Sequence, residues 1–377
     1  MSIVNQQMIA EHLNISVATV SKALRNQPGV SEALRERVAQ AARDLGYQRV
    51  RSRTTSSSAR RSLMLAALIR QPLTHGNSRL PEYIDGLCES SSRLNASVLI
   101  QTYGYKSCVE NIATDPSLQP PAMREGKVHG LLLGGEWPAH VVTELARNYP
   151  CVCFPNDVEA DVDQIGLNTA RTSLQIMRHL TSLGHQRIGF LGRCDFAWAG
   201  ERFAGYVAAL SRVGLTYDSD CVIDIDREPM LSVGNESYWR QIVDRVDACR
   251  RAGVSAWMCS SDWPGYQLFR GMLDRGVRVP QDISIFGFDD SELVNLGCPP
   301  LTSVRIPREV MGRAALRRLI SRIDHPDLPV QQTLFTGKLM INGTTGPAQG
   351  AAEHIEQPHR RHNGEDDSPQ VAMKETW

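Results

Sequence analysis

Apolar side chains recur at helical spacing in three short segments of the first 47 residues. Ser16 is placed to cap the second segment, and Gly46 follows the third, as helix starts and stops require. Spacings of three and four residues place the apolar side chains of each segment on one helix face. The positions predicted to face inward are Ile9, Ala10 and Leu13, then Val20, Ala23 and Leu24, then Leu34, Val38, Ala41 and Leu45. The pattern predicts a small all-α unit over residues 1–47.

The pattern changes twice further along the chain. Residues 48–61 are basic and rich in serine and offer no apolar face, so we expect a linker there. Beyond it, short apolar runs alternate with amphipathic segments of helical length. The runs expected to be strands are 63–69, 97–102, 128–133, 150–154, 188–192, 255–259 and 283–288, and the expected helices are 81–94, 170–182, 201–212, 236–252 and 263–275. The alternation predicts an α/β core of parallel strands over 62–346, and the polar segment 347–377 is expected to be a disordered tail.

Charge sharpens this division of the chain. The 377 residues carry 41 basic and 41 acidic side chains, a balance that by itself gives no reason to expect a nucleic-acid partner. Charge has to be judged domain by domain, however, and residues 1–61 hold ten basic and four acidic side chains. The first 61 residues are therefore net basic and the remainder net acidic. We expect the small unit to bind DNA and the core not to.

The segment from Gln6 to Arg25 has the pattern of a helix-turn-helix. Asn14 takes a turn position that needs tolerance of positive φ, and the outer face of the second helix is the one that such a motif presents to the major groove. Lys22 is suited to guanine acceptors and the hydroxyl groups to phosphate oxygens. The predicted DNA contacts on and near this face are Ser16, Val17, Ala18, Thr19, Ser21, Lys22, Arg25 and Asn26. The alternative is a three-helix bundle whose basic face is merely solvated.

Several motifs, in order, resemble the lactose-repressor (LacI) family of bacterial transcription regulators. In the first unit they are Ile9-Ala-Glu-His-Leu-Asn-Ile-Ser-Val-Ala-Thr-Val-Ser-Lys-Ala-Leu-Arg-Asn, Val30-Ser-Glu-Ala-Leu-Arg-Glu-Arg-Val and Leu45-Gly-Tyr47. In the core they are Leu183-Gly-His-Gln-Arg-Ile-Gly-Phe-Leu-Gly192, Glu201-Arg-Phe-Ala-Gly-Tyr-Val-Ala-Ala-Leu210, Gly276-Val-Arg-Val-Pro-Gln-Asp-Ile-Ser-Ile-Phe-Gly-Phe-Asp-Asp290 and Pro299-Pro-Leu-Thr-Ser-Val304. The resemblance runs from about residue 4 to residue 346.

This resemblance implies a fold for the core. It predicts a periplasmic-binding-protein-like architecture in which two Rossmann-like subdomains are joined by three crossovers. The first subdomain is expected over about 62–165 and 292–321, and the second over about 166–291 and 322–346. The crossovers are expected near Gln164–Asn168, Asp290–Asn295 and Ser321–Asp324. A ligand would bind in the cleft at the carboxyl ends of the strands.

The resemblance also implies an effector site. Carried over position by position, the contacts fall on Asn156, Arg202, Ser261 and Asp289, and Trp263 is a candidate stacking wall. An arginine and an aspartate that face each other across a cleft suit vicinal hydroxyls, because one donates and the other accepts. This chemistry favours a sugar-like small molecule. The alternatives are a structural ion pair for Arg202 and core packing for Trp263.

The linker departs from the family pattern. Members of the family usually carry Pro-Asn and then a hinge helix whose leucine enters the minor groove, whereas here Gln48-Arg49-Val50-Arg51 and Ser56 occupy the corresponding region. A serine cannot wedge between base steps as an apolar side chain does. We therefore expect the linker to bind DNA electrostatically, through Arg49, Arg51 and Arg53.

The sequence thus predicts a ligand-responsive DNA-binding regulator, most simply a repressor. We expect a cytoplasmic protein, because no signal peptide is apparent, the longest apolar run is too short to span a bilayer, and the nine cysteines show no disulfide framework. We expect a homodimer formed through the core, because a twofold dimer matches an inverted-repeat operator. No nucleophile, P-loop or Cys-x-x-Cys pair indicates an enzyme or a cofactor, and His359 and His362 lie in the tail rather than in a metal site. The alternatives are a regulator that senses a protein partner and a small-molecule binding protein without a DNA role.

Overall fold

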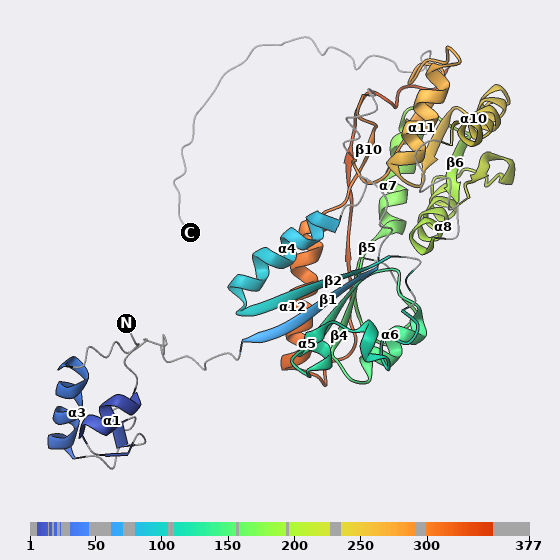
Figure 1. The fold of residues 1–377 in the computed structure, drawn as a ribbon. Coiled ribbons are helices and arrows are strands. Elements are labelled where there is room, and N and C mark those ends of the chain that lie inside the picture. Colours follow the sequence, from blue (N-terminus) through green and yellow to red (C-terminus); the bar gives the residue numbers. More distant parts are fainter. Residues whose placement is uncertain are drawn as a thin grey trace, which may run out of the picture. The chain divides into compact units, whose positions relative to one another are not determined.

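The computed structural model divides into two compact units, one within residues 1–61 and the other within residues 62–377 (Figure 1). The predicted linker (48–61) and most of the predicted tail lie outside the described part of the chain. The structure describes residues 6–13, 15–16, 19–20, 23, 31–44, 62–70, 80–104, 107, 109–155, 158–193, 196–226, 235–291 and 299–349.

The small unit contains α1 (Gln6–Leu13) and α3 (Glu32–Asp44). Its core confirms the predicted inward face wherever that face is described. The buried side chains are Ala10, Val20, Ala23, Val38, Ala41 and Ala42, with Leu13, Ile15 and Leu34 packed against them. Ile9, Leu24 and Leu45, also predicted to face inward, lie outside the residues whose side chains are described. Alanines dominate this core because short helices that cross closely leave little room between them.

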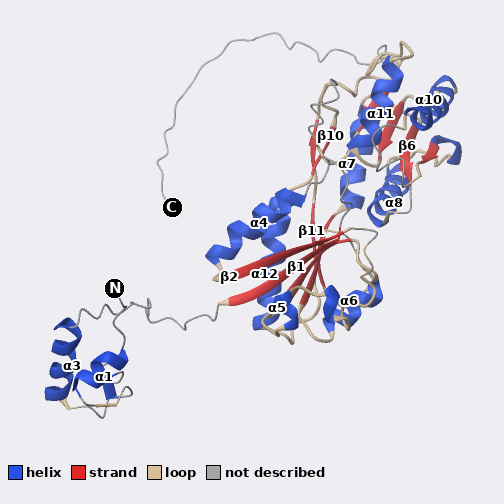
Figure 2. Ribbon diagram, in the orientation of Figure 1, coloured by secondary structure: helices blue, strands red, loops and turns tan. Residues whose placement is uncertain are grey.

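The large unit begins with a six-stranded parallel sheet in the order β11-β5-β4-β3-β1-β2 (Figure 2). Its strands are β1 (Leu63–Arg70), β2 (Ala96–Tyr103), β3 (Gly130–Gly135), β4 (Cys151–Phe154), β5 (Asp163–Leu167) and β11 (Gln332–Phe335). Strand β1 is buried on both faces: Leu65, Ala67 and Ile69 pack toward one hydrophobic cluster, and Ala66 and Leu68 toward another. A continuous apolar run such as 63–69 is what a central parallel strand needs.

Two pairs of helices cover this sheet. On one side lie α4 (Leu80–Arg93) and α12 (Arg308–Asp324), and on the other α5 (Pro121–Arg124) and α6 (Ala139–Ala146), together with the short 3-10 turn Pro116–Leu118 (Figure 1). Helices α4 and α12 approach at backbone distance through glycines. A Cβ atom at Gly86 would lie 2.0 Å from the Glu309 carbonyl oxygen, and one at Gly312 would lie 2.3 Å from that of Tyr83. This contact fixes the start of α12, where a functional side chain lies.

The second sheet has the order β7-β6-β8-β9, also parallel. Its strands are β6 (Ile188–Arg193), β7 (Val222–Asp224), β8 (Ala256–Cys259) and β9 (Ser284–Phe286), and its helices are α7 (Thr169–Ser182), α8 (Ala197–Arg212), α10 (Glu236–Arg251) and α11 (Asp262–Leu273), with a 3-10 turn at Ser219–Cys221. The antiparallel pair β10 (Ser303–Arg305) and β12 (Lys338–Met340) adjoins β9 through a bridge between Phe286 and Thr302. The predicted pair of Rossmann-like subdomains is confirmed.

The chain crosses between the subdomains three times. The first crossing, at Asn168, falls in the predicted range, and the others lie at Ile306–Pro307 and Thr336–Gly337. The crossing segments are bonded to one another. The Asn168 N–H donates to the Phe335 carbonyl at 2.7 Å, and the Gly337 N–H donates to Thr172 Oγ1 at 3.3 Å.

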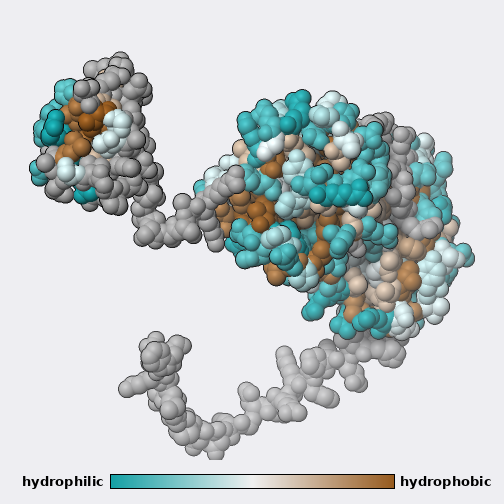
Figure 3. Space-filling view, turned by 90° about the horizontal axis from the view of Figure 1, so that it is seen from below, coloured by the Kyte–Doolittle hydropathy of each residue, from teal (hydrophilic) through white to brown (hydrophobic). Residues whose placement is uncertain are grey.

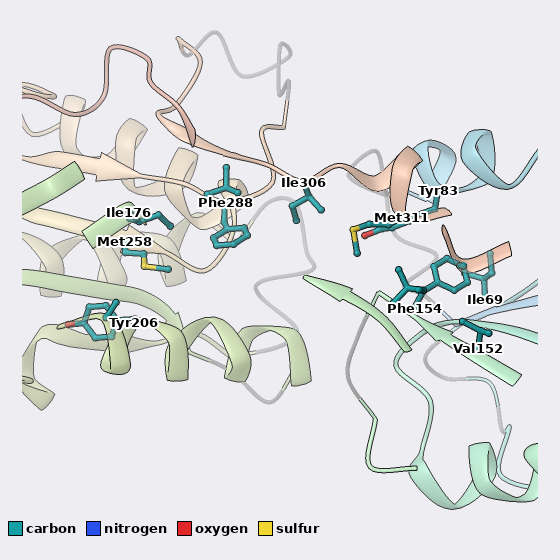
Figure 4. Close-up of a cluster of buried hydrophobic side chains, with 14 of the residues drawn as sticks. Ile69, Tyr83, Val152, Phe154, Ile176, Tyr206, Met258, Phe288, Ile306 and Met311 are labelled. Carbon is teal, nitrogen blue, oxygen red and sulfur yellow. The ribbon is translucent and has the colours of Figure 1, made fainter. Parts of the chain in front are cut away.

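The crossovers predicted near Asp290–Asn295 and Ser321–Asp324 are wrong. Residues 299–305 stay with the second subdomain because β10 adjoins β9, and residues 322–335 stay with the first because β11 pairs with β5. Figure 4 shows Ile306 between Phe288 of the second subdomain and Met311 of α12. One apolar cluster therefore continues through the junction of the two subdomains.

Polar side chains cover most of the face of the core drawn in Figure 3, with apolar positions scattered among them. Of the helices that the structure describes, none combines the length and apolar character needed to cross a membrane.

Candidate functional site

In the small unit, Ser16 and Thr19 are the two predicted DNA contacts that the structure describes. The Thr19 N–H donates to Ser16 Oγ at 3.1 Å, and the two hydroxyl oxygens lie 2.8 Å apart. The N–H of Val20 donates to the Ser16 carbonyl at 3.1 Å. Ser16 thus has the geometry of an N-cap, as predicted. The remaining predicted DNA contacts lie outside the described residues: Val17, Ala18, Ser21, Lys22, Arg25, Asn26, Arg49, Arg51 and Arg53.

In the core, the candidate site is centred on Asp289. This residue follows β9 directly after the buried Phe288 and has φ = 109°, and the next residue, Asp290, has φ = 52°. The Asp289 N–H donates to the Val304 carbonyl at 3.0 Å, which holds this backbone against β10. Aspartate is among the few residues with a side chain that tolerate positive φ. Backbone strain of this kind is concentrated at functional sites.

Arg202, on α8, is the first partner of Asp289. Its Nη2 atom lies 2.9 Å from Asp289 Oδ1 and its Nη1 atom 3.3 Å from Oδ2. The guanidinium lies over the Phe288 ring at 3.9 Å and over the Trp198 ring at 4.8 Å, and it also donates to the Ser260 carbonyl. Arg202 is only 8% exposed, so aromatic faces and acceptors replace water around its charge.

Arg308, the first residue of α12, is the second partner of Asp289. Its Nη2 atom donates to Asp289 Oδ1 at 2.8 Å, its Nη1 atom donates to the Asp289 carbonyl at 3.2 Å, and Glu82 of α4 lies 3.4 Å away. Burial opposes the charge on this buried arginine, but Asp289, Tyr83 and Glu82 outweigh burial and raise the pKa of Arg308. We call Arg202, Asp289 and Arg308 the junction cluster, because it ties the second subdomain to the helix that packs on the first.

The expectation that Arg202 and Asp289 face each other across a cleft is wrong. Both belong to the second subdomain, and they form a direct ion pair. The alternative of a structural pair therefore describes the present arrangement. The pair nevertheless leaves acceptor capacity, because Oδ2 of Asp289 accepts one long hydrogen bond among the described residues and its side chain is 18% exposed.

The other predicted effector contacts differ in how far the structure supports them. Ser261 precedes α11, is 8% exposed and makes no capping bond with its side chain. Trp263 is half-buried and packs against the second subdomain's hydrophobic core, in line with the core-packing alternative. Its Nε1 atom has no hydrogen-bond partner within the described chain. Asn156 lies outside the described residues.

Asp262 was not predicted from the sequence as a site residue. It lies between Ser261 and Trp263 in the chain and is almost wholly buried. Its Oδ1 accepts the Ser303 hydroxyl at 2.6 Å, and its Oδ2 accepts the Ser291 N–H. Burial, followed by the nearby charge of Asp289, raises the pKa of Asp262 to about 7. The signal that could have identified Asp262 is its position as an acidic residue in the first helical turn after a strand. Arg308 was also missed, because nothing local connects it with Asp289.

Among the described residues, no group of three or more histidine, cysteine, aspartate or glutamate side chains is placed to hold a metal ion. His359 and His362 lie outside that part of the chain.

Comparisons with known proteins agree with the division of the chain into a small helical unit and an α/β core. Residues 7–49 match the model for bacterial regulatory proteins of the lacI family, and residues 177–345 match that for a periplasmic binding protein-like domain. The HTH-type transcriptional repressor CytR of Escherichia coli (strain K12) is 27% identical over 343 residues, covering 89% of this chain and 95% of CytR. The HTH-type transcriptional regulator MalR of Streptomyces coelicolor is 28% identical over 359 residues, covering 91% and 96%.

Two solved structures show the same fold. The Lac repressor dimer bound to operator and the anti-inducer ONPF is 21% identical, with a TM-score of 0.64 over 92% of this chain and 100% of that one. The complex of the transcriptional regulator CelR with cellobiose is 24% identical, with a TM-score of 0.61 over 90% and 99%.

Proposed function

Because the chain belongs to the lacI family of bacterial regulatory proteins, we propose that it is a transcription repressor whose affinity for an operator is set by a sugar-like effector. Residues 1–47 bind the operator, residues 48–61 link this unit to the core, and the core binds the effector. The relatives are named as transcription regulators, and this supports the expectation that the chain is not an enzyme.

The junction cluster is the observation that carries the effector half of the proposal. It places two buried guanidinium groups beside a carboxylate that is partly exposed, with aromatic rings against one of them. Neighbouring hydroxyls of a sugar need this combination, and an apolar ring face packs against the sugar's C–H groups. The CelR structure contains cellobiose, and this favours a carbohydrate for the present chain as well. Asn156, Ser261 and Trp263 complete the proposed contacts.

The cluster also provides a route from effector to DNA. Asp289 holds Arg202 of the second subdomain and Arg308 at the start of α12, which packs on the first subdomain. A hydroxyl that competes for Asp289 weakens its bond to Arg308. The balance between two arrangements of the subdomains then shifts by the difference in effector affinity. Hinged closure about the three crossing segments transmits the change.

For the small unit, we propose that the outer face of the second helix enters the major groove. Ser16 and Thr19 position the helix on phosphates, Lys22 reads a base edge, and Arg49, Arg51 and Arg53 add electrostatic contacts from the linker. A homodimer on an inverted repeat matches this geometry, since a twofold axis pairs two half-sites. A protein that acts on chromosomal DNA works in the cytoplasm of a bacterium.

A thermal-shift and calorimetric screen of mono- and disaccharides tests the effector. We expect one class of sugar to bind, and we expect Arg202→Ala and Asp289→Asn each to weaken its binding at least tenfold. The control Arg147→Ala removes an exposed arginine that follows α6 and should leave binding unchanged. If no sugar binds while a protein captured from the host alters operator affinity, the regulator senses a protein partner instead.

Operator binding is tested with Lys22→Ala. The lost base contact should cost about 1–3 kcal/mol on the selected operator and relax its sequence preference. Mobility-shift assays on the operator and on a scrambled duplex measure both effects. Equal weakening on the two duplexes would restrict Lys22 to a phosphate contact.

A further inference from the structure

A groove of about 540 Å³ is lined by residues of α7 and α8 and by none of the junction cluster. Figure 1 shows these two helices side by side. Arg171, Gln175 and Arg178 line it from α7, and Arg212 lines it from α8. The first three lie on one helix face, since their spacings are three and four residues. The volume is in the range of small-molecule sites in proteins.

The three arginines of this groove carry positive charge that the protein does not neutralise. Within the described chain none of their guanidinium groups has a hydrogen bond or an ion pair, and none of the groove's lining residues is acidic. Several other arginines of the core are paired, as Arg187 is with Asp218 and Arg278 with Asp282. Like charges gathered along one groove repel each other and attract an anion.

Gln175 adds a second, independent demand for a ligand. Its Oε1 atom is buried and has no hydrogen-bond partner in the described part of the chain. An unpartnered buried acceptor costs free energy. Gln175 is only half-buried as a residue and lines the groove, so a rotation of its amide would turn Oε1 toward a donor there and recover that free energy. Leu174, Ala208 and Ala209 give the groove an apolar portion. The lining therefore fits a molecule that has anionic groups, a hydroxyl donor and some apolar surface.

We propose that this groove binds a phosphorylated metabolite with free hydroxyl groups, at a site separate from the junction cluster. The arginines bind the phosphate through charge-assisted hydrogen bonds, and Gln175 accepts from a hydroxyl. Asn168 also lines the groove, and its backbone N–H bonds to Phe335 at the crossing segments. A ligand there contacts the hinge directly.

Isothermal titration of the intact protein tests the site, with glucose 6-phosphate, AMP and pyrophosphate as probes and glucose as the uncharged control. We expect a phosphorylated probe to bind at millimolar concentration or tighter. Arg178→Ser and Arg212→Ser should each weaken it at least tenfold, while the matched surface variant Arg147→Ser leaves it unchanged.

Gln175→Leu separates binding of the phosphate by the arginines from binding of a hydroxyl by Gln175. It should weaken the hydroxylated probes and leave pyrophosphate unaffected, because pyrophosphate has no alcohol to donate. The proposal is overturned if no phosphorylated probe binds or if Arg147→Ser weakens binding equally. It is also overturned if Arg202→Ala abolishes binding while the groove variants do not, which would place the probe in the junction cluster. Tighter binding of polyglutamate, lost in the groove variants, would assign the groove to an acidic polypeptide and would also overturn the proposal.

Discussion

An aspartate bound by two arginines lies near each end of helix α12. The two clusters differ in which parts of the core they connect. Near the carboxyl end of α12, Asp163 of β5 receives hydrogen bonds from Arg318 and Arg322 and from the Gln331 N–H. All of these residues belong to the first subdomain. At the amino end, Asp289 holds Arg308 of α12 and Arg202 of the second subdomain. The Asp163 cluster therefore connects elements within the first subdomain, whereas the Asp289 cluster connects the two subdomains.

The two carboxylates also differ in what capacity they have left. The Asp163 side chain is fully buried, and both of its oxygens accept short hydrogen bonds. Burial would raise its pKa, but the hydrogen bonds from Arg322 and Arg318 outweigh burial and lower the pKa. Asp289 keeps partial exposure and a weakly used oxygen at a residue of positive φ. A saturated cluster stabilises, whereas an unsaturated cluster on strained backbone is available to a ligand.

The largest expected effect is the loss of stability in Asp163→Asn. The amide cannot balance two arginines beneath the sheet, and removing one partner of a buried ion pair costs about 3–5 kcal/mol. Urea unfolding of the core at pH 7 measures the free energy. Asp161→Asn, an exposed carboxylate two residues away, serves as control and should stay within about 0.5 kcal/mol of the natural protein.

The pH dependence of Asp163 follows from its lowered pKa. A carboxyl whose pKa is lower in the folded protein stabilises above its unfolded pKa, and the contribution is lost as pH falls through the folded value. The stability gap between the natural protein and Asp163→Asn should therefore close in acid. A gap that persists unchanged to pH 2 would mean that packing, not charge, accounts for the difference.

The next largest effect is the loss of effector response in Asp289→Asn. Asparagine tolerates positive φ, so the backbone is retained while the charge on Arg202 and Arg308 loses its partner. We expect a stability loss of about 1–2 kcal/mol, smaller than at Asp163 because the site is partly exposed and Glu82 still faces Arg308.

The readout for Asp289→Asn is operator affinity with and without the effector. The natural protein should change its affinity, and the variant should not. A variant with normal effector response but severe loss of stability would show that Asp289, like Asp163, only stabilises the core. The proposed functional difference between the two clusters would then be wrong.

The third effect concerns Asp262, which burial and Asp289 keep at a pKa of about 7. A carboxyl whose pKa is raised by folding contributes most when protonated, so its contribution is present near pH 4 and is lost as pH rises through about 7. Asp262→Asn removes this dependence. Relative to the natural protein, its unfolding free energy should rise between pH 4 and pH 8, because over this range the natural protein loses the stability that its protonated carboxyl contributes.

Parallel urea titrations of Asp262→Asn and of the exposed control Asp327→Asn measure this difference. A flat difference for Asp262→Asn would show that Ser303 and Ser291 hold the carboxylate charged, and the link to Asp289 would then be weaker than its neighbourhood indicates.

Local sequence pattern was enough to predict the elements that are buried on both sides. Strands such as β1 and β8 are continuous apolar runs, and α7 and α10 have clear apolar faces. Edge strand β11 was missed because its residues are mostly exposed, so no apolar pattern marks it. Helix α12 was missed although its buried apolar residues recur at helical spacing: Met311, Ala315, Leu316, Leu319 and Ile320. Both misses displaced the predicted crossovers.

The site was less accessible to sequence than the fold. Arg202 and Asp289 were identified through a family resemblance, and nothing in their spacing of 87 residues shows that they touch. Arg308 binds Asp289 only because α12 is fixed on α4 by Gly86 and Gly312. Long-range packing, not local pattern, therefore created the bridge between the subdomains.

The smallest effect is expected three residues before Arg308, at Arg305. This arginine pairs with Asp290, the neighbour of Asp289, but its side chain is 58% exposed. Because exposed ion pairs contribute little, Arg305→Ala should change the unfolding free energy by less than about 0.5 kcal/mol and leave the effector response intact. Arg308→Ala removes the same charge on the other side of the crossing segment and should abolish the response. If Arg305→Ala also abolishes it, the bridge between the subdomains extends to Asp290 and β10, and burial alone does not mark the residues that carry the signal.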